Sequence, residues 1–415
     1  MVMTDVQRQR AVRRARIPWS MEVSDPRARR GQRHGHTGLL SLMVAAFACG
    51  RTVLRQMEDL SGDLGRSARR ALELPRKVSD STLYRLLSAQ KPTGFRQTVV
   101  AFIKDLIARK VIQNDIFAKG VMSLDGKSTW TSTDREVNGA KVTPSGNDGP
   151  TTYSFSSLRA VLTSSRAKPC VDQELIASKE GESPAFREVL PRVCKNFGNH
   201  FKIVTGDAGL MCRENAQLVA NHGKYYVFGL KGNQPTLHTA AERAFTLCPS
   251  VLRAKTEERS QGNIVVRELH THSVHDAPDV DVADAKQFWR ITQTTRPCEG
   301  EPTVEIRYFI SSTPHGFLSP KEQLEVVRLH WGIENGHNWT MDLMLQEDER
   351  KPCQANKNAI EVVCWLRIIG YNILAAWRAH APKKDRRPMP WARVMELFRD
   401  SLVGSSPEVI VPTLA

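Results

Sequence analysis

The sequence of 415 residues predicts an α/β protein with a helical N-terminal region, and three observations carry this prediction. Apolar residues recur at helical spacing between residues 38 and 112. Short apolar runs alternate with helical patterns over residues 113–240. Residues 241–312 are rich in alternating and β-branched segments, and helical patterns follow them. Strands mixed with helices favour a layered sheet flanked by helices.

The positive charge of the chain is concentrated in its first quarter. The chain has 59 Lys and Arg against 44 Asp and Glu, a net charge of +15. Residues 1–100 hold 19 basic and 8 acidic residues, which leaves only +4 for the rest. A basic quarter on a near-neutral body favours a polyanionic partner, most often nucleic acid. A solubilising tail is the alternative.

Several protein classes are excluded by composition. The longest apolar run, residues 38–50, is shorter than the ~20 residues that a spanning helix needs. It follows a leader with nine arginines, which is untypical of a signal peptide. The sequence therefore predicts a buried helix there, and a cytoplasmic protein with no membrane partner. The eight cysteines are scattered without a Cys-x-x-Cys pair, which excludes a zinc ribbon and a dense disulfide framework.

The chain divides into six predicted parts. Residues 1–37 are rich in arginine and predict a basic flexible arm. Residues 38–112 predict a helical domain, in which the helix after Ser79 either reads DNA or belongs to an ordinary bundle. The remaining parts are the first part of a core (113–240), a β-rich insertion (241–312), the second part of the core (313–380) and a basic linker and tail (381–415).

Two predicted strands of the core end in an aspartate. Asp125 follows the apolar run at 121–124 and precedes a glycine, and Asp207 follows the apolar run at 201–204. Ligands of α/β sheets usually bind where such strands end. Each aspartate alone is typical of a turn or a cap. Together they predict a pair of hard oxygen ligands for Mg²⁺.

A glutamate in the second part of the core adds a third acid. Ser319-Pro320 predicts a helix start, and Glu334 shares one face of that helix with Leu324 and Trp331. We therefore expect Glu334 to face the body of the protein. Two strand-end aspartates and one inward glutamate can hold two divalent ions for phosphoryl transfer. A salt bridge from Glu334 to Arg328 is the alternative.

Five sequence strings occur in an order that resembles one known family. They are Asp125-Gly126-Lys127, Lys179-x-x-Glu182, Thr205-Gly206-Asp207-Ala208, Leu230-Lys231-Gly232-Asn233-Gln234 and His330-Trp331-Gly332-Ile333-Glu334-Asn335. Their order and spacing over residues 38–376 resemble the H-repeat-associated branch of the DDE transposases of bacterial insertion sequences. The last two strings are the most specific.

The resemblance implies both a fold and an activity. The fold is an RNase H-like mixed sheet flanked by helices, with a β-rich insertion before the catalytic glutamate helix and a helical N-terminal domain. The implied catalytic and metal-binding triad is Asp125, Asp207 and Glu334, with two Mg²⁺ ions that Mn²⁺ can replace. The implied enzyme cleaves DNA at element ends and transfers the strand into target DNA, as a homodimer in the synaptic complex.

The sequence also departs from related patterns. The histidine that follows Glu334 is His337, one position earlier than in the family string Ile-Glu-Asn-x-x-His. The Tyr-Arg-Glu-Lys signature of other insertion-sequence transposases is not intact, because Val327, His330 and Met341 stand at its offsets. We therefore expect DNA contacts from other residues, each with a purely structural role as its alternative. The candidates are Lys127, Lys231, Asn233, Gln234, Arg328, His330 and Trp339.

Two further functions remain open at this point. One is a catalytically decayed or repurposed DNA-binding protein derived from a transposase, and the other is an RNase H-like nuclease without strand transfer. All three candidate acids are present, which favours an enzyme. The acidic run Glu347, Asp348 and Glu349 offers an alternative third ligand, but a solvated acidic face is favoured, since Leu345 is the only apolar residue near it.

Overall fold

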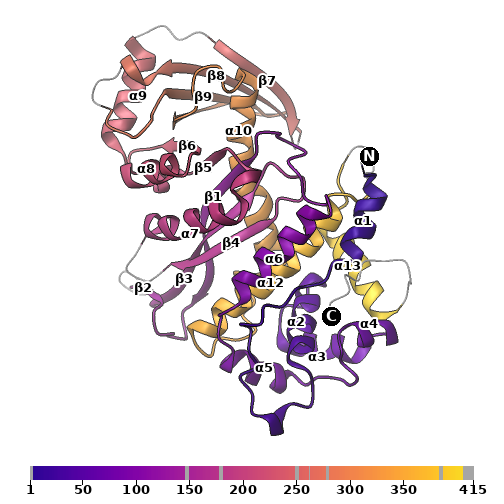
Figure 1. The fold of residues 1–415 in the computed structure, drawn as a ribbon. Helices are drawn as coiled ribbons and strands as arrows, with labels where there is room; N and C mark the ends of the chain where they lie inside the picture. The colour runs from indigo at the N-terminus through magenta and orange to yellow at the C-terminus, as the bar shows by residue number, and fades with distance from the viewer. Residues whose placement is uncertain are drawn as a thin grey trace. The chain divides into compact units, whose positions relative to one another are not determined.

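The computed structural model describes residues 3–144, 149–176, 181–247, 252–260, 262–276, 280–382 and 387–404. Lys179 of the second sequence string and the end of the predicted tail, 405–415, lie outside these residues. The chain forms two compact units (Figure 1). Unit 1 comprises Met1–Ala118, Gly126–Gly181 and Glu334–Ala415, and unit 2 comprises Lys119–Asp125 and Glu182–Ile333.

Unit 1 is built on helix α12 (Lys357–Arg378), which packs against α2 (His36–Ala48). By length and composition α12 could cross a membrane, but 94% of its apolar stretch is buried inside the protein. A Cβ atom on Gly370 would lie only 3.2 Å from the Val44 carbonyl oxygen, so glycine permits this close approach. The apolar run of α2 is a buried helix, as predicted from the sequence.

The other helices of the N-terminal region confirm its predicted helical character. The hydroxyl of Ser79 accepts a hydrogen bond from the Thr82 backbone and begins α5, at the predicted start. The further helices of unit 1 are α1 (Asp5–Arg13), α3 (Leu54–Asp63), α4 (Arg66–Ala71), α5 (Asp80–Ala89), α6 (Phe95–Ala108), α11 (Trp339–Leu343) and α13 (Trp391–Val403).

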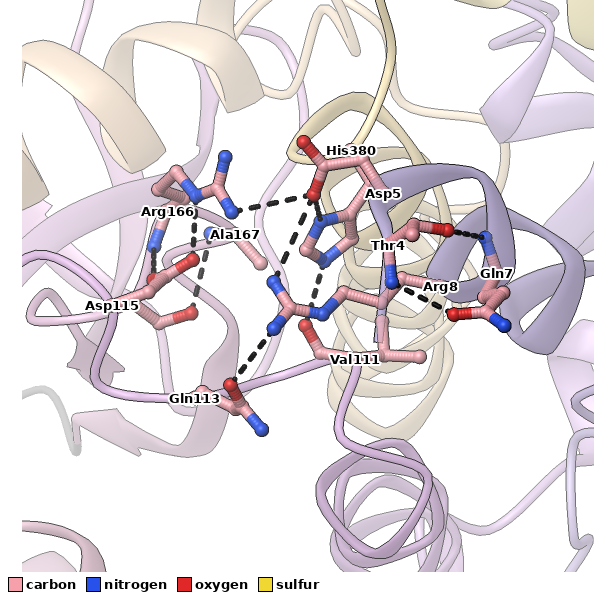
Figure 2. Close-up of polar contacts among 11 residues, drawn as sticks. Thr4, Asp5, Gln7, Arg8, Val111, Gln113, Asp115, Arg166, Ala167 and His380 are labelled. Atoms are coloured by element: carbon pink, nitrogen blue, oxygen red, sulfur yellow. Dashed lines mark hydrogen bonds and ion pairs between the residues drawn. The ribbon is translucent and has the colours of Figure 1, made fainter. Parts of the chain in front are cut away.

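The predicted flexible arm is structured where it is described. Its residues 5–13 form α1, and Val12 is fully buried. Asp5 on α1 accepts a hydrogen bond from His380, and Arg8 donates one to Gln113 (Figure 2). The arginine-rich composition concealed the apolar positions that hold this segment against the rest of unit 1. The prediction of a flexible arm is therefore wrong for these residues.

The strands of unit 1 lie in the order β2 (Lys141–Thr143), β3 (Thr152–Leu162), β1 (Val121–Ser132), with β4 (Cys170–Ile176) antiparallel to β3. β1 belongs to both units, since the unit boundary falls between Asp125 and Gly126.

Unit 2 contains a mixed sheet in the order β1-β5-β6-β10-β9-β8-β7. β5 (Ile203–Gly206) runs parallel to β1 and to β6 (Tyr225–Leu230), and the ladders from β6 onward are antiparallel. The predicted β-rich insertion is present as β7 (Leu252–Ser260), β8 (Asn263–Ser273), β9 (Gln287–Arg296) and β10 (Thr303–Ser311).

Four helices accompany the sheet of unit 2. They are α7 (Glu182–Phe197), α8 (Arg213–Asn221), α9 (Pro235–Leu247) and α10 (Pro320–Gly332). α10 begins where the sequence predicts, because Ser319 and Glu322 form a capping box and Pro320 occupies the first position. The predicted α/β class, with a mixed sheet flanked by helices and a helical N-terminal region, is confirmed.

Candidate active site

Asp125 lies within β1, which continues to Ser132, and Asp207 directly follows the end of the parallel neighbour β5. The predicted strand end at Asp125 is therefore wrong. β1 and β5 pair from Val121–Ile203 to Ser123–Thr205, and two further residues along each strand lead to the two aspartates. The Thr205 hydroxyl donates to the Ser123 hydroxyl at 2.8 Å. Side chains two residues apart return to the same face of a strand, and neighbouring strands lie about 4.8 Å apart. The register thus places the two aspartates side by side at the level where β5 ends.

The turn after β5 holds the Asp207 carboxylate. Asp207 Oδ1 accepts hydrogen bonds from the backbone amides of Gly209 at 3.0 Å and Leu210 at 3.2 Å, at the short 3₁₀ helix η3 (Ala208–Leu210). These bonds fix one carboxylate oxygen toward the protein. Glu182, at the start of α7, is near enough that burial and the charge of Asp207 raise the pKa of its carboxyl.

Asn233 and Gln234 hold the same turn from its other side. Asn233 Nδ2 donates to the Ala208 carbonyl at 2.8 Å, and Gln234 Nε2 donates to the Met211 carbonyl at 2.6 Å. Their amides therefore serve the backbone around Asp207, contrary to the expectation that they contact DNA. Lys231, in the same sequence string, is exposed and stays a predicted DNA contact.

His330 lies beneath the two aspartates in the interior. It is 5% exposed, and its Nδ1 lies 3.2 Å from the Thr205 hydroxyl. Because Thr205 donates its own proton to Ser123, His330 Nδ1 is the donor in this contact. Burial lowers the pKa of His330 to about 4, so the ring is neutral. The prediction that His330 contacts a DNA phosphate is therefore wrong.

The burial of His330 should appear in the pH dependence of stability. Its folded pKa of about 4 lies below the ordinary value of 6.5, so folding favours the neutral ring. This stabilisation is fully present above pH 6.5 and is lost as the pH falls toward 4, by about 3 kcal/mol in all. We expect His330→Asn, whose amide can still donate to Thr205, to flatten urea-unfolding stability between pH 6.5 and 4.

The matched control is the exposed His222, and His222→Asn should keep the wild-type pH profile. Burial and the charges of Arg159 and Lys127 also lower the pKa of His337, but His337 is present in both variants, so the difference between them isolates His330. A wild-type profile in His330→Asn would contradict the assigned neutral state.

Glu334 occupies a π-helix, η5 (Ile333–Asn338), that directly follows α10. The side chain is exposed, contrary to the expectation that it faces the body. That expectation assumed an α-helical period through Glu334, whereas the wider π-helical turn rotates the following residues out of the α10 register. π-Helical turns are frequent at functional sites.

The remaining DNA candidates have different surroundings. Arg328 is half-exposed and bonds Glu258 at 3.1 Å. Arg307 and Arg267 stack on Trp331, with guanidinium carbons 4.5 and 5.6 Å from the ring centre. Trp339 on α11 is 48% exposed, which is untypical of a core tryptophan. Arg328 and Trp339 stay predictions as DNA contacts.

Lys127 is buried in unit 1 among three carboxylates. Its ammonium nitrogen contacts Asp342, lies 3.0 Å from Asp348 Oδ1 and lies 3.7 Å from Glu347 Oε2. Burial, together with its neighbour Asp348, raises the pKa of Asp342 to about 6. With its charge enclosed in this way, Lys127 does not present an ammonium to DNA, and that prediction is wrong.

Arg159 is the ion-pair partner of Glu347, and the sequence did not predict this pair. Its guanidinium donates to Glu347 Oε1 at 2.7 Å, and both side chains are 0% exposed. Burial opposes the ionised form of Glu347, but the charges of Arg159 and Lys127 hold its pKa below the usual range. Glu347 is therefore not available as an alternative third metal ligand. The available signal was an arginine inside the apolar strand Leu158–Leu162.

The donor set can be compared with the preferences of Mg²⁺. Asp125 and Asp207 belong to unit 2 and Glu334 to unit 1. Within the ranges that the structure describes, no group of three His, Cys, Asp or Glu side chains is arranged to hold an ion. Mg²⁺ is usually bound by one or two carboxylates together with substrate phosphates. The pair Asp125 and Asp207 fits that requirement.

The chain matches two family models and is similar to proteins of Escherichia coli. Residues 121–373 match the family model described as Transposase DDE domain, and residues 21–103 match a model described as DDE_Tnp_1-associated. The chain is 24% identical to the protein YbfL of Escherichia coli (strain K12) over 364 residues, 82% of this chain and 85% of YbfL. It is 25% identical to the H repeat-associated YhhI of the same strain over 308 residues, 71% of this chain and 72% of YhhI.

A solved structure was also found by the comparison of folds. The cryo-EM structure of the piggyBac transposase synaptic complex with hairpin DNA has a TM-score of 0.44 and 10% identity. The match covers 97% of this chain and 81% of that chain. The family match, in contrast, covers more than half of the chain and contains Asp125, Asp207 and Glu334. The chain therefore belongs to the DDE transposase family, in its H-repeat-associated branch.

Proposed function

We propose that the protein cleaves DNA strands at the ends of an insertion sequence and joins the freed 3′-hydroxyl to target DNA. The observation that carries this proposal is the register of β1 and β5, which aligns Asp125 with Asp207 where β5 ends. The match to the Transposase DDE domain supports the same chemistry. Glu334, exposed in the π-helix after α10, is the third acid of the proposal.

Each residue of the proposed site would have its own role in metal binding and catalysis. Two Mg²⁺ ions, when bound, would supply an activated nucleophile and stabilise the leaving oxygen of the phosphodiester. Asp125 and Asp207 would hold ions beside the end of β5, and Glu334 would complete the ligand set. Mn²⁺ can replace Mg²⁺ because both prefer oxygen ligands. Because His330 beneath the aspartates is neutral, it does not offset the negative charge with which the carboxylates would bind the cations.

The DNA partner would contact exposed groups of each unit. Trp339 and Leu343 are both exposed and stand one helical turn apart on α11. An exposed aromatic ring can stack on an unpaired base. Lys231 offers an exposed ammonium to a phosphate. Two element ends must be cut together, so we propose that the active form is a homodimer.

The direct test incubates the full-length protein with DNA that carries the terminal inverted repeats flanking its gene. Cleavage at the element end, followed by joining to a target plasmid, is expected with Mg²⁺ or Mn²⁺ and not with EDTA. Specific binding without cleavage would instead support a repurposed DNA-binding protein. Cleavage without joining would support a nuclease.

Asn233 provides a prediction for the turn that carries Asp207. Asn233→Ala removes the amide that holds the Ala208 carbonyl, so the carboxylate of Asp207 is less well oriented. We expect a 10–100-fold loss of cleavage rate or of apparent Mg²⁺ affinity, as is typical when a group that orients a metal ligand is lost. The exposed Asn221→Ala is a matched control at a helix end. An unchanged Mg²⁺ titration in Asn233→Ala would contradict this role.

A further inference from the structure

Helix α5 of unit 1 has one buried face and one exposed face. The helix contacts α3 and α12, and its buried face consists of leucines that are at most 1% exposed, namely Leu83, Leu86 and Leu87. Positions 81, 84 and 85 lie three and four residues apart, so Ser81, Tyr84 and Arg85 share one exposed face. Tyr84 is 43% exposed. The exposed face therefore combines a hydroxyl, an aromatic ring and a guanidinium.

The start of α5 is fixed by side chains of α3. Glu58 Oε2 accepts a hydrogen bond from the Asp80 backbone amide at 3.0 Å, and the same carboxylate forms an ion pair with Lys77 at 2.9 Å. The Ser61 hydroxyl accepts a hydrogen bond from the Val78 amide at 2.9 Å. These bonds satisfy backbone amides at and before the helix start and hold the entry of the chain into α5.

The end of α5 is fixed as well. Asn356 Nδ2 donates to the Ser88 carbonyl at 2.9 Å. Gln90, which caps the helix, has its Oε1 2.8 Å from His36 Nε2, and its Nε2 donates to the Ser24 carbonyl at 3.3 Å. Because both ends of α5 are held, the helix loses little backbone freedom when its exposed face binds a partner.

Basic residues flank the exposed face at both ends of α5. Arg76 precedes the helix and Lys91 follows it, and both side chains are exposed, as is Arg85. Within the part of the chain that the structure describes, none of these three side chains forms an ion pair. Three cations along one exposed helix are therefore available to an anionic partner.

A second segment adds positive charge near Arg76. Burial lowers the pKa of His34, and so do the charges of the surrounding arginines, Arg27, Arg76 and Arg33. Arg27 is paired with Asp25 at 2.8 Å, whereas Arg33 is exposed. The surface beside the start of α5 is thus basic, and its charge complements a polyanion such as DNA.

We infer that α5 enters the major groove of the DNA at the element end and reads its sequence through Arg85. An α-helix fits this groove, which is about 12 Å wide, and the 10 residues of α5 span about 15 Å. Arg85 bonds O6 and N7 of one guanine, the commonest specific contact of arginine with a base. Arg76 and Lys91 contact phosphates at the two ends of the helix and position it without reading bases. The inference rests on the proposed function, since it takes element-end DNA as the substrate.

The test measures the affinity of the full-length protein for two duplexes by fluorescence anisotropy across a range of salt concentrations. One duplex is the terminal inverted repeat that flanks the gene, and the other is a shuffled sequence of the same length. Arg85→Gln should weaken binding to the repeat roughly 10–100-fold and lower the preference over the shuffled duplex by the same factor. Arg76→Gln should weaken binding to both duplexes equally and lower the salt slope by about one.

Arg109→Gln is the matched control for both substitutions. Arg109 is exposed at the end of α6 in the same unit, but it is paired with Asp105 at 2.7 Å. This variant should keep the wild-type affinity, preference and salt slope. Thermal unfolding of each variant monitors the fold.

Replacement of single guanines in the repeat by 7-deazaguanine locates the base that Arg85 contacts. One position should weaken binding of the wild type, because the N7 acceptor in the major groove is lost, and should leave Arg85→Gln unaffected. The inference is overturned if the wild type does not prefer the repeat, if Arg85→Gln keeps the wild-type preference, or if no position shows this non-additivity. Absence of cleavage by a wild-type protein that passes these binding tests would overturn the proposed reaction and leave the role of α5 standing.

Discussion

Asp207→Asn is expected to abolish metal-dependent DNA cleavage while DNA binding and folding are retained. Asparagine keeps the side-chain oxygen that accepts from Gly209 and Leu210, so the turn after β5 is preserved. What is lost is the negative charge that would hold the cation. Transition-state stabilisation by a metal ion amounts to several kcal/mol, so the rate should fall by roughly 10³-fold or more. The rate of strand cleavage with saturating Mg²⁺ is the measurement.

The exposed Asp281 of the same unit supplies the control. Asp281 forms an ion pair with Arg213 at the surface, and Asp281→Asn should cleave at the wild-type rate. Asp125→Asn is expected to reproduce the loss seen in Asp207→Asn, since each residue lies two positions beyond the last pair of the β1–β5 ladder, Ser123 and Thr205. Normal cleavage by either variant would show that the aspartate pair is not the catalytic centre.

The positions of the two aspartates could be predicted from sequence because they depend on local patterns. A mostly apolar stretch that leads into an acid and a small residue describes both positions, although β1 continues past Asp125 to Ser132. The capping box at Ser319 fixed the start of α10 in the same way. Signals of this kind depend only on residues within one or two helical turns of one another. They do not require knowledge of which distant residue lies nearby.

The errors concern partners that only the tertiary structure supplies. Lys127, Asn233 and His330 carry polar groups of the kind that bind DNA, yet each one satisfies a protein group. Polar groups are needed beside strand ends, where unpaired carbonyls and buried charges would otherwise be costly. Sequence pattern identifies such residues without deciding between protein and nucleic acid as their partner. The sequence argument for Glu334 assumed an α-helical period and so did not predict the π-helix there.

The buried ion pair between Arg159 and Glu347 leads to the second large prediction, which concerns stability. Arg159→Met keeps most of the side-chain volume but leaves the fully buried Glu347 carboxylate without its closest partner. Removing one member of a buried pair typically costs about 3–5 kcal/mol of unfolding free energy. Urea denaturation at pH 7 measures this loss. The exposed pair Arg393–Glu396 is the control, and Arg393→Met should cost under about 1 kcal/mol.

A second substitution separates charge from packing as the cause. If the cost in Arg159→Met comes from the uncompensated carboxylate, Arg159→Met/Glu347→Leu should recover part of the lost stability, because both charges are then absent. Recovery should stay incomplete, since Lys127 would lose a carboxylate 3.7 Å away. No recovery would show that shape around Arg159 dominates.

The same charge network lies close in sequence to two of the candidate catalytic acids. Lys127 is two residues from Asp125. His337, whose Nε2 lies 3.5 Å from Arg159 Nη1, is three residues from Glu334. Loss of this charge network should therefore also slow cleavage, through the segments that carry both acids.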